Sequence, residues 1–222
     1  MSSSKQSNNS SQTKLRISLI LNAAMVILEL MGFVVAIGNN GWSLMGYYTQ
    51  ESNLVLLAAG LAYLIGHLRK MHGNIPYGIS LLKFIATALT TVTFLVVVFC
   101  FVPMCYPNRE AMVGIVFGEA NLYHHFVCPL IGAISYLFFE QDYVPTKRDA
   151  FYAMLPTLCY AIVTTSLNVA RVIQGPYPFL YVYEQPVWAS VLWFVAIPGG
   201  GYLFARLFAR IKRRFTISSQ KS

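Results

Sequence analysis

Residues 79–104 of this chain read ISLLKFIATALTTVTFLVVVFCFVPM. Apart from Lys83 near its start, the stretch carries no charge. It is longer than the roughly 20 mostly apolar residues that take an α-helix across a lipid bilayer. It therefore predicts a transmembrane helix, and the rest of the chain follows the same plan.

The whole chain has the composition of an integral membrane protein. Of its 222 residues, 56% are hydrophobic and only 11% are charged, whereas a water-soluble domain carries about a quarter charged residues. Five more apolar runs can be recognised, at residues 15–37, 52–68, 123–139, 150–173 and 187–208. We therefore predict an all-α, polytopic membrane protein with six transmembrane helices and no water-soluble domain.

Three regions follow from this pattern. Residues 1–13 are rich in Ser, Asn and Gln and are expected to form a disordered polar tail. Residues 14–212 form the six-helix transmembrane domain, and residues 213–222 form a basic cytoplasmic tail. The first apolar run is longer than the apolar part of a secretory signal peptide and has no clear cleavage site, so we expect a retained first span.

Basic residues set the predicted orientation, because the cytoplasmic flanks of transmembrane helices are enriched in Lys and Arg. With the N-terminus in the cytoplasm, all 16 Lys and Arg residues except Arg109 and Arg171 fall on the inner side. We therefore predict a multi-pass protein of the cytoplasmic (cell) membrane with both termini in the cytoplasm. Contact with anionic lipid headgroups then explains the net charge of +8, and no nucleic-acid partner is expected.

Polar residues from distant parts of the chain meet at the predicted outer face. Odd-numbered spans end there and even-numbered spans begin there. Thr49–Asn53, the pair His124 and His125, and the segment Asn168–Phe179 therefore all lie at that face. This convergence predicts a polar pocket in the outer half of the bundle.

Two charged residues near or inside apolar runs have alternative explanations. Glu29 lies well inside residues 15–37, where an ionisable side chain is a functional candidate by default. A hydrogen-bonded carboxyl that locks helix packing is the other interpretation. Arg171 belongs to the end of the fifth run. It can reach the outer headgroups, pair with Glu29, or bind an anionic group of a substrate.

Other polar residues have structural explanations. Glu51 or Ser52 can cap the second span, since side-chain oxygens there satisfy free backbone N–H groups. The third span is rich in threonine, and such hydroxyls usually bond back to their own helix or to a neighbour, which indicates packing. The four cysteines show no metal-ligand spacing and are interpreted as small buried apolar side chains. A disulfide between Cys105 and another outer cysteine stays open.

A hydroxyl, an imidazole and hydrogen-bond donors at one face are the groups that acyl transfer needs. The imidazole takes the proton of the hydroxyl and so makes it a nucleophile. We predict Thr49 as the nucleophile and His125 as the base, with His124 as the alternative base. Asn53, or the free N–H groups at the start of the second span, can stabilise the oxyanion. No cofactor and no metal are expected, since two histidines without a third ligand make a poor zinc site.

Three motifs occur in order along the chain. They are YYTQESNL at residues 47–54, NLYHHFVCP at residues 121–129, and the segment from Asn168 to GPYPFL at residues 175–180. Together they resemble the androgen-induced/androgen-dependent transmembrane family, and most closely its bacterial six-span members. The likeness covers nearly all of the chain.

The resemblance implies a function and a set of residues. The animal members are similar to threonine hydrolases that cleave fatty acid esters of hydroxy fatty acids, with an essential Thr and an essential His. Carried over, these are Thr49 and either His125, four residues before Pro129, or His124. The spacing from Thr49 to Asn53 is one residue longer here than in the animal hydrolases.

The predicted function is therefore a lipid-ester hydrolase or acyl transferase that acts on a fatty-acyl ester from membrane lipids. A non-catalytic structural or lipid-binding membrane protein is the first alternative. A proton-coupled carrier of small solutes that uses Glu29, His124 and Arg171 is the second, although carriers usually contain internal repeats and none is recognisable. The predicted substrate-binding residues are Asn53, Glu29, Tyr123, Asn168, Arg171 and Tyr177.

Overall fold

The computed structural model describes residues 2–69, 75–118, 120–141 and 143–221, with side chains from residue 9 to residue 216 of those ranges. In these ranges the chain is helical with short connections, and no strand occurs. Six helical segments are long and apolar enough to cross a membrane, which confirms the predicted all-α polytopic fold. They are Asn9–Gly46, Tyr48–Arg69, Tyr77–Met104, Leu122–Phe139, Lys147–Val169 and Val187–Thr216.

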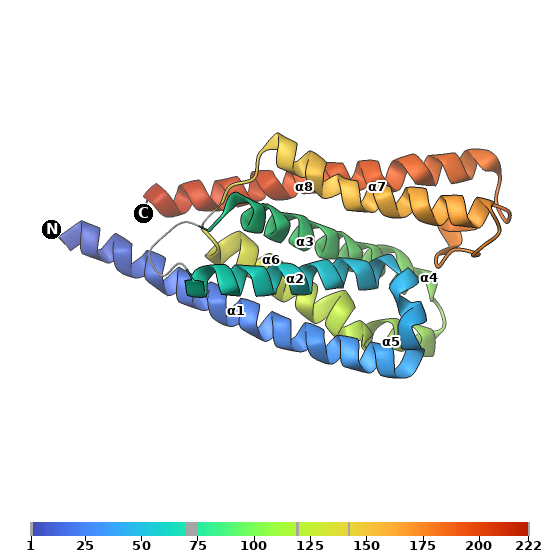
Figure 1. The fold of residues 1–222 in the computed structure, drawn as a ribbon, viewed down its shortest axis with the longest axis horizontal. Helices are drawn as coiled ribbons and strands as arrows, with labels where there is room; N and C mark the ends of the chain where they lie inside the picture. The colour runs from blue at the N-terminus through green and yellow to red at the C-terminus, as the bar shows by residue number, and fades with distance from the viewer. Residues whose placement is uncertain (1, 70–74, 119, 142, 222) are drawn as a thin grey trace.

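The long helices form two groups (Figure 1). The second group is α7 (Lys147–Val169) and α8 (Val187–Lys221), which run side by side and pack along α3 (Tyr77–Val96) of the first group. Short connections between consecutive spans make neighbouring helices antiparallel. Besides α3, the first group contains α1 (Ser2–Asn40), α2 (Tyr48–Arg69) and the short helix α6 (Cys128–Ile134) of the fourth span.

The two ends of the bundle differ. The beginning of α1 and the end of α8 lie at the same end (Figure 1), as an even number of crossings requires. We call this the inner end, after the predicted orientation, and the opposite one the outer end. The outer end carries η1 (Gly41–Gly46) between α1 and α2, and α5 (Arg109–Phe117) between α3 and the fourth span.

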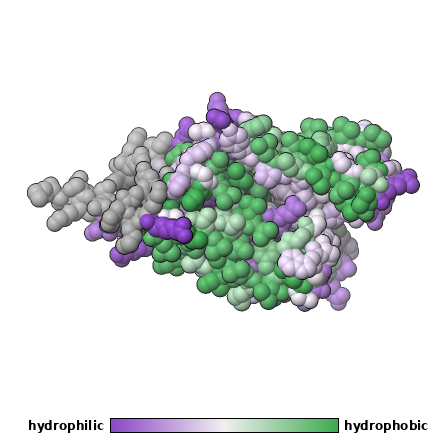
Figure 2. All heavy atoms as spheres, viewed as in Figure 1, coloured by the Kyte–Doolittle hydropathy of each residue, from purple (hydrophilic) through white to green (hydrophobic). Residues whose placement is uncertain are grey.

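The surface between the two ends is suited to lipid. Figure 2 shows apolar residues spread over the middle of the molecule, with hydrophilic residues gathered toward its ends. Large apolar side chains point outward from several helices, among them Val34, Phe99 and Val195. In water such exposure would be unfavourable, whereas in a bilayer these side chains meet hydrocarbon.

The helix of the first span extends into the N-terminal tail. The disorder expected for residues 1–13 stays a prediction, while the structure draws α1 from Ser2 without a break into the first span. Extending an existing helix is far easier than nucleating one, and the first 13 residues contain neither Gly nor Pro to stop it. In the same way α8 continues to Lys221, through most of the predicted tail at residues 213–222.

Within the described residues, three π-helical turns interrupt the spans. They are η2 (Val97–Phe101) at the end of α3, and η3 (Leu122–Val127) and η4 (Ser135–Phe139) on either side of α6. A π turn is wider than an α turn, changes the direction of the following side chains, and is frequent near functional sites. The two adjacent histidines both lie in η3.

Among the described residues, two large apolar cores and a small third one, made of Ala36, Leu44 and Ala120, hold the bundle together. Met25 and Leu56 belong to the core that joins α1, α2 and α6. Phe84, Tyr136 and Phe208 belong to the core that joins α3, η4 and α8, where the rings of Tyr136 and Phe208 stack with their centroids 5.7 Å apart. The second core therefore attaches the α7–α8 pair to the rest of the molecule.

The threonines of α3 take part in packing, as predicted. The hydroxyls of Thr87, Thr90, Thr91 and Thr93 donate to carbonyls of the preceding turn at 2.8, 3.0, 2.6 and 3.1 Å. Each polar group is thereby satisfied within its own helix, which is what a span in lipid needs. This confirms that these hydroxyls belong to the helix packing.

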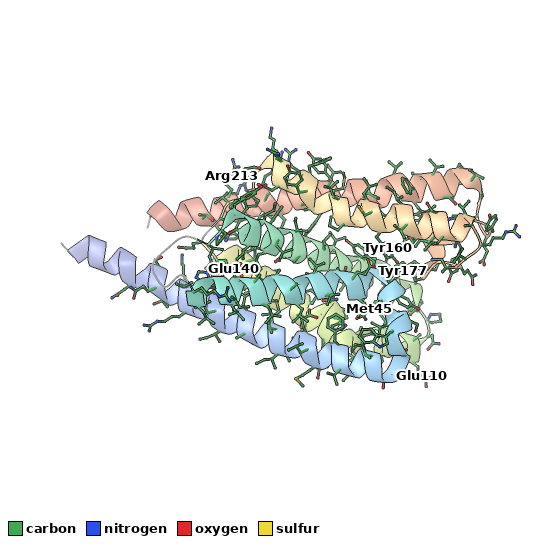
Figure 3. All side chains as sticks on the ribbon, viewed as in Figure 1. Met45, Glu110, Glu140, Tyr160, Tyr177 and Arg213 are labelled. Carbon is green, nitrogen blue, oxygen red and sulfur yellow. The ribbon has the colours of Figure 1, made fainter. Side chains whose placement is uncertain are left out.

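A buried polar network closes the inner end, where Figure 3 labels Glu140. Glu140 Oε1 accepts hydrogen bonds from Asn22 at 2.9 Å and from Ser135 at 2.8 Å. Lys83 Nζ lies 3.6 Å from the same oxygen. Lys212 of α8 donates to the main-chain carbonyls of Tyr136 and Glu140 at the end of η4, where a helix favours a positive charge. The network thus ties α1, α3 and α8 to η4.

We expect the exchange Glu140→Gln to destabilise the fold by about 3–5 kcal/mol, because Lys83 would keep a buried charge without a counter-charge. Thermal unfolding of the detergent-purified protein measures this as a lower midpoint. The double variant Lys83→Met/Glu140→Gln should regain most of the loss. Equal midpoints for the single and double variants would show that the unpaired Lys83 charge is not the cause of the loss.

Candidate functional site

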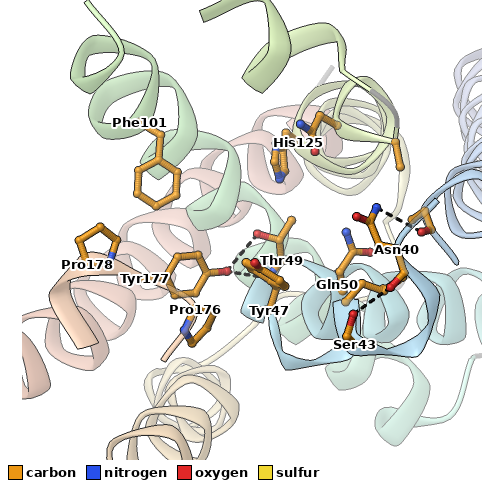
Figure 4. Close-up of a pocket in the computed structure, with 14 residues that line it drawn as sticks. Asn40, Ser43, Tyr47, Thr49, Gln50, Phe101, His125, Pro176, Tyr177 and Pro178 are labelled. Carbon is orange, nitrogen blue, oxygen red and sulfur yellow. Dashed lines mark hydrogen bonds between the residues drawn. The ribbon is translucent and has the colours of Figure 1, made fainter. Parts of the chain in front are cut away.

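A cavity of about 460 Å³ opens at the outer end, between η1, the start of α2, η3 and the turn after α7 (Figure 4). Apolar residues such as Ala36 and Phe101 form part of its wall. We call it the polar cavity, because its remaining lining is rich in hydroxyl, amide and imidazole groups. These come from Asn40, Ser43, Tyr47, Thr49, Gln50, Asn121, His125 and Tyr177.

Thr49 lies in the first turn of α2 and is buried apart from its exposure to this cavity. Its Oγ1 and its backbone N–H both lie 3.4 Å from the Tyr177 hydroxyl oxygen. Burial raises the pKa of the Tyr177 phenol, so this group keeps its proton at neutral pH and is available as a donor. Tyr177 is therefore the direct neighbour of the predicted nucleophile.

The turn that carries Tyr177 is fixed by its own sequence. Gly175 adopts φ +87°, a backbone conformation that L side chains rarely adopt. Asn168 donates from its Nδ2 to the carbonyl of Gln174, and the following proline, Pro176, restricts the chain further. Asn168 thus holds the turn in place and does not line the cavity.

A second cavity, of about 420 Å³, lies between α3, α7 and α8. We call it the apolar cavity, because its lining is dominated by side chains such as Val96, Ala161 and Trp193. The two cavities share four lining residues: Thr49, Phe101, Tyr177 and Pro178. Thr49 therefore stands at the junction of a polar and an apolar space. In the close-up, Phe101 and Pro178 lie on one side of it, and Asn40, Ser43 and Gln50 on the other (Figure 4).

His125 lines the polar cavity together with Thr49. Its Nδ1 lies 3.4 Å from the carbonyl oxygen of Ile115 in α5. A carbonyl can only accept, so in this contact Nδ1 carries the proton and Nε2 is left as an acceptor. That is the tautomer a general base needs, and the short helix α5 is what orients the ring.

His124 points the other way, into the bundle, because consecutive residues on a helix face different directions. Its side chain is fully buried, with Nε2 3.4 Å from Oε2 of the equally buried Glu29. The alignment of this contact falls short of a hydrogen bond, so we describe it as a close contact between two buried side chains. The ring of Phe33 packs on the imidazole, with the centroids 4.6 Å apart.

Gly32 explains how η3 comes so close to α1. A Cβ atom at this position would lie 2.5 Å from Nε2 of His124 and 3.1 Å from Cβ of Tyr123. Any larger residue would push the histidine out of its place beside Glu29. Tyr123 itself packs against the core of α1, α2 and α6 and does not belong to the lining of either cavity.

Asn53 joins the two halves of the site. Its Nδ2 donates to the carbonyl of Thr49 at 2.7 Å and to the carbonyl of His124 at 3.0 Å. Both N–H bonds of the amide are then in use, so Asn53 positions the site and leaves the oxyanion to another donor. Ser52 also donates to the Thr49 carbonyl, at 2.9 Å. The expected cap by Glu51 or Ser52 is not formed, because α2 already begins at Tyr48.

For Arg171 the structure decides one of the three roles left open by the sequence. It is exposed at the outer end, and its guanidinium lies 4.7 Å from the ring centroid of Tyr183. It does not pair with Glu29, whose close contact is His124. The structure therefore brings Thr49, His125 and Tyr177 together at one cavity and places Glu29, Tyr123, Asn168 and Arg171 elsewhere.

Several residues of the site were not predicted. Asn40, Ser43, Gln50 and Asn121 line the polar cavity, and Ile115 holds His125 through its backbone. For Gln50, its place next to Thr49 in the sequence was the one feature that could have indicated a position at the site. The role of Ile115 depends on a carbonyl, which every residue has.

The four cysteines are free, so the disulfide left open for Cys105 is not formed. Cys128 is buried against α1 with its Sγ 3.9 Å from the Met25 carbonyl. Cys100 and Cys159 are exposed, so the prediction of buried side chains is wrong for these two. Among the described residues, no group of three His, Cys, Asp or Glu side chains is arranged to hold a metal ion. The polar cavity itself presents hydroxyls, amides and one imidazole.

The two histidines should respond differently to substitution. We expect His124→Ala to destabilise the protein by about 3–5 kcal/mol, since it removes a fully buried ring and leaves a cavity beside Phe33 and Glu29. His125→Ala, the matched control, should change the unfolding midpoint little because that ring borders a cavity. Thermal unfolding in detergent compares the two, and equal midpoints would contradict the division of roles.

Known proteins offer no further guide to the site. No family model, no curated protein and no solved structure matches this chain. The assignment of roles therefore starts from the geometry of Thr49, His125 and Tyr177 at the outer end.

Proposed function

We propose that this chain is an integral-membrane lipid-ester hydrolase or acyl transferase, with Thr49 as nucleophile and His125 as general base. One observation carries the proposal. The Thr49 hydroxyl stands where the polar cavity, which His125 also lines, meets the apolar cavity. An ester between an acyl chain and a polar alcohol needs such a junction at its reacting carbonyl.

The reaction runs in two steps. In the first, His125 Nε2 takes the proton of Thr49, and Oγ1 attacks the ester carbonyl carbon. The bond to the alcohol oxygen breaks, this oxygen takes the proton from His125, and the acyl group stays on Thr49. In the second step, His125 takes a proton from water, the resulting hydroxide releases the fatty acid, and Thr49 regains its proton. With another alcohol in place of water, the same site transfers the acyl group.

Tyr177 is the donor we assign to the oxyanion. Its phenol keeps its proton because burial raises its pKa, and its oxygen lies 3.4 Å from Thr49 Oγ1. A donor this close to the nucleophile can reach the oxygen that becomes negative in the transition state. Asn53, the donor expected from the sequence, has both N–H bonds engaged.

The likeness to threonine hydrolases of the androgen-induced/androgen-dependent transmembrane family supports the same assignment. In that family an essential Thr and an essential His act on fatty-acyl esters. Of the two histidines carried over from the resemblance, His125 shares a cavity with Thr49, and His124 is engaged with Glu29. Geometry and resemblance thus favour the same pair.

The proposal is tested with a fluorophosphonate probe and a long-chain p-nitrophenyl ester on the purified protein in detergent. We expect Thr49→Ala to abolish labelling and turnover and Thr49→Ser to retain part of both. His125→Ala should lower kcat by about 10²–10⁴-fold, the usual contribution of a general base. His125→Gln, which keeps a polar side chain, should not restore it.

The control is a folding check on every variant by its elution and unfolding midpoint. If a folded wild-type protein neither reacts with the probe nor cleaves any ester, the hydrolase proposal fails. Lipid retained by that protein through purification would then favour the non-catalytic lipid-binding alternative.

The apolar cavity gives a second test. We expect Ala161→Phe, which fills part of this cavity from α7, to shift the preference toward shorter acyl chains. Rates on p-nitrophenyl esters of increasing chain length measure the shift, with Ile162→Phe on the lipid-exposed face of the same helix as control. An unchanged chain-length profile would show that the acyl chain binds elsewhere.

A further inference from the structure

We infer that the polar cavity selects esters whose alcohol part is uncharged and carries free hydroxyl groups, as in an acylglycerol. The inference rests on the proposed function, and it names the substrate class of that same site. Three observations point to it: the charge of the lining, the kind of hydrogen-bonding groups presented, and an unsatisfied buried acceptor.

The first observation is the absence of charge. Within the described part of the chain, no Lys, Arg, Asp or Glu lines the polar cavity. The two outer arginines are engaged or placed elsewhere. Arg171 lies over the ring of Tyr183, and Arg109 opens the exposed start of α5. A carboxylate or phosphate entering this cavity would lose water without gaining a positive partner, which is strongly unfavourable.

The second observation is that the cavity presents acceptors. Ser43 uses its proton in a 2.8 Å bond to the carbonyl of Asn40, which leaves its oxygen as an acceptor. Asn121 uses its Nδ2 on the carbonyl of Gly114, at 3.0 Å. The acceptor Nε2 of His125 is reserved for the Thr49 proton, so the acceptors left for a ligand are those of Ser43 and Asn121. Hydroxyl groups of a ligand can donate to such groups, whereas carboxylates and phosphates mainly accept.

The third observation is Gln50. Its side chain lines the polar cavity next to Thr49, and its Oε1 is buried without a hydrogen-bond partner. A buried acceptor without a donor lowers stability, and such groups in folded proteins are usually explained by a ligand or by water. A small turn of the side chain toward the cavity would let a ligand hydroxyl donate to it.

These observations fit one kind of molecule. The acyl chain of the ester enters the apolar cavity, its carbonyl reaches Thr49, and its alcohol part fills the polar cavity. Glycerol has the required chemistry, since it is uncharged and keeps two hydroxyls in a monoacylglycerol. When the ester is cleaved, the glycerol oxygen of the broken bond takes the proton held by His125.

The test compares 1-oleoylglycerol with 1-oleoylglycerol 3-phosphate in mixed micelles of a neutral detergent. The two esters share acyl chain and glycerol and differ by the phosphate. We expect kcat/KM to favour the neutral ester by at least about tenfold, because the phosphate finds no cation in the cavity. Equal rates, or a preference for the phosphate ester, would overturn the inference.

A charge introduced at Gln50 sharpens the test. Gln50→Lys should raise the ratio of phosphate ester to neutral ester cleaved, since it supplies the missing cation. Gln50→Met, of similar length and without charge, is the matched control and should weaken the neutral ester without favouring the phosphate. A Lys variant with the same ratio as the Met variant would count against the assigned head-group site.

Binding of uncleavable analogues separates this inference from the proposed function. The ether 1-O-oleylglycerol and its 3-phosphate are titrated by the change in tryptophan fluorescence or by competition with a bound fluorescent fatty alcohol. Selective binding of the neutral ether without any ester turnover would retain the head-group site and reject the hydrolase. Turnover of esters with no selectivity would do the reverse.

Discussion

The geometry of the outer end depends on one side-chain amide. Asn53 donates one N–H to the carbonyl of Thr49 and the other to the carbonyl of His124. The first bond lies within α2, and the second crosses to η3. The same amide group therefore holds the backbone of Thr49 and the backbone of His124, the residue before His125. An amide buried in a membrane bundle has no water with which to replace a lost hydrogen bond. Its two bonds therefore fix the relative position of two spans that are far apart in the sequence.

Glu29 and His124 stabilise this arrangement from the interior of the bundle. The pair fills the space between α1 and η3, where Gly32 permits close approach. With one histidine anchored in the bundle, its neighbour has to face the cavity. The inner end follows a different rule, since charged groups around Glu140 join three helices to η4. The bundle is thus closed by polar bonds at the inner end, and the polar and apolar cavities lie toward the outer end.

The sequence predicted the architecture well because a long apolar run has few structural interpretations other than a transmembrane helix. The six spans and the convergence of Thr49, His125 and the Tyr177 turn at one end all follow from counting crossings. Which of two adjacent histidines faces the cavity did not follow, because the π turn that sets their direction leaves no simple pattern in the sequence. The extent of α1 beyond its apolar run did not follow either, since polar residues can continue a helix that packing has already started.

The uncharged lining of the polar cavity also affects the rate at which a ligand encounters the site. Among the described residues, no fixed charge stands in the cavity to draw a ligand from a distance, so long-range steering of the kind seen in charged clefts plays no part there. The lipid ester proposed above would dissolve in the leaflet and meet the bundle by lateral diffusion. The encounter rate would then follow the mole fraction of the lipid in the bilayer and be nearly independent of ionic strength.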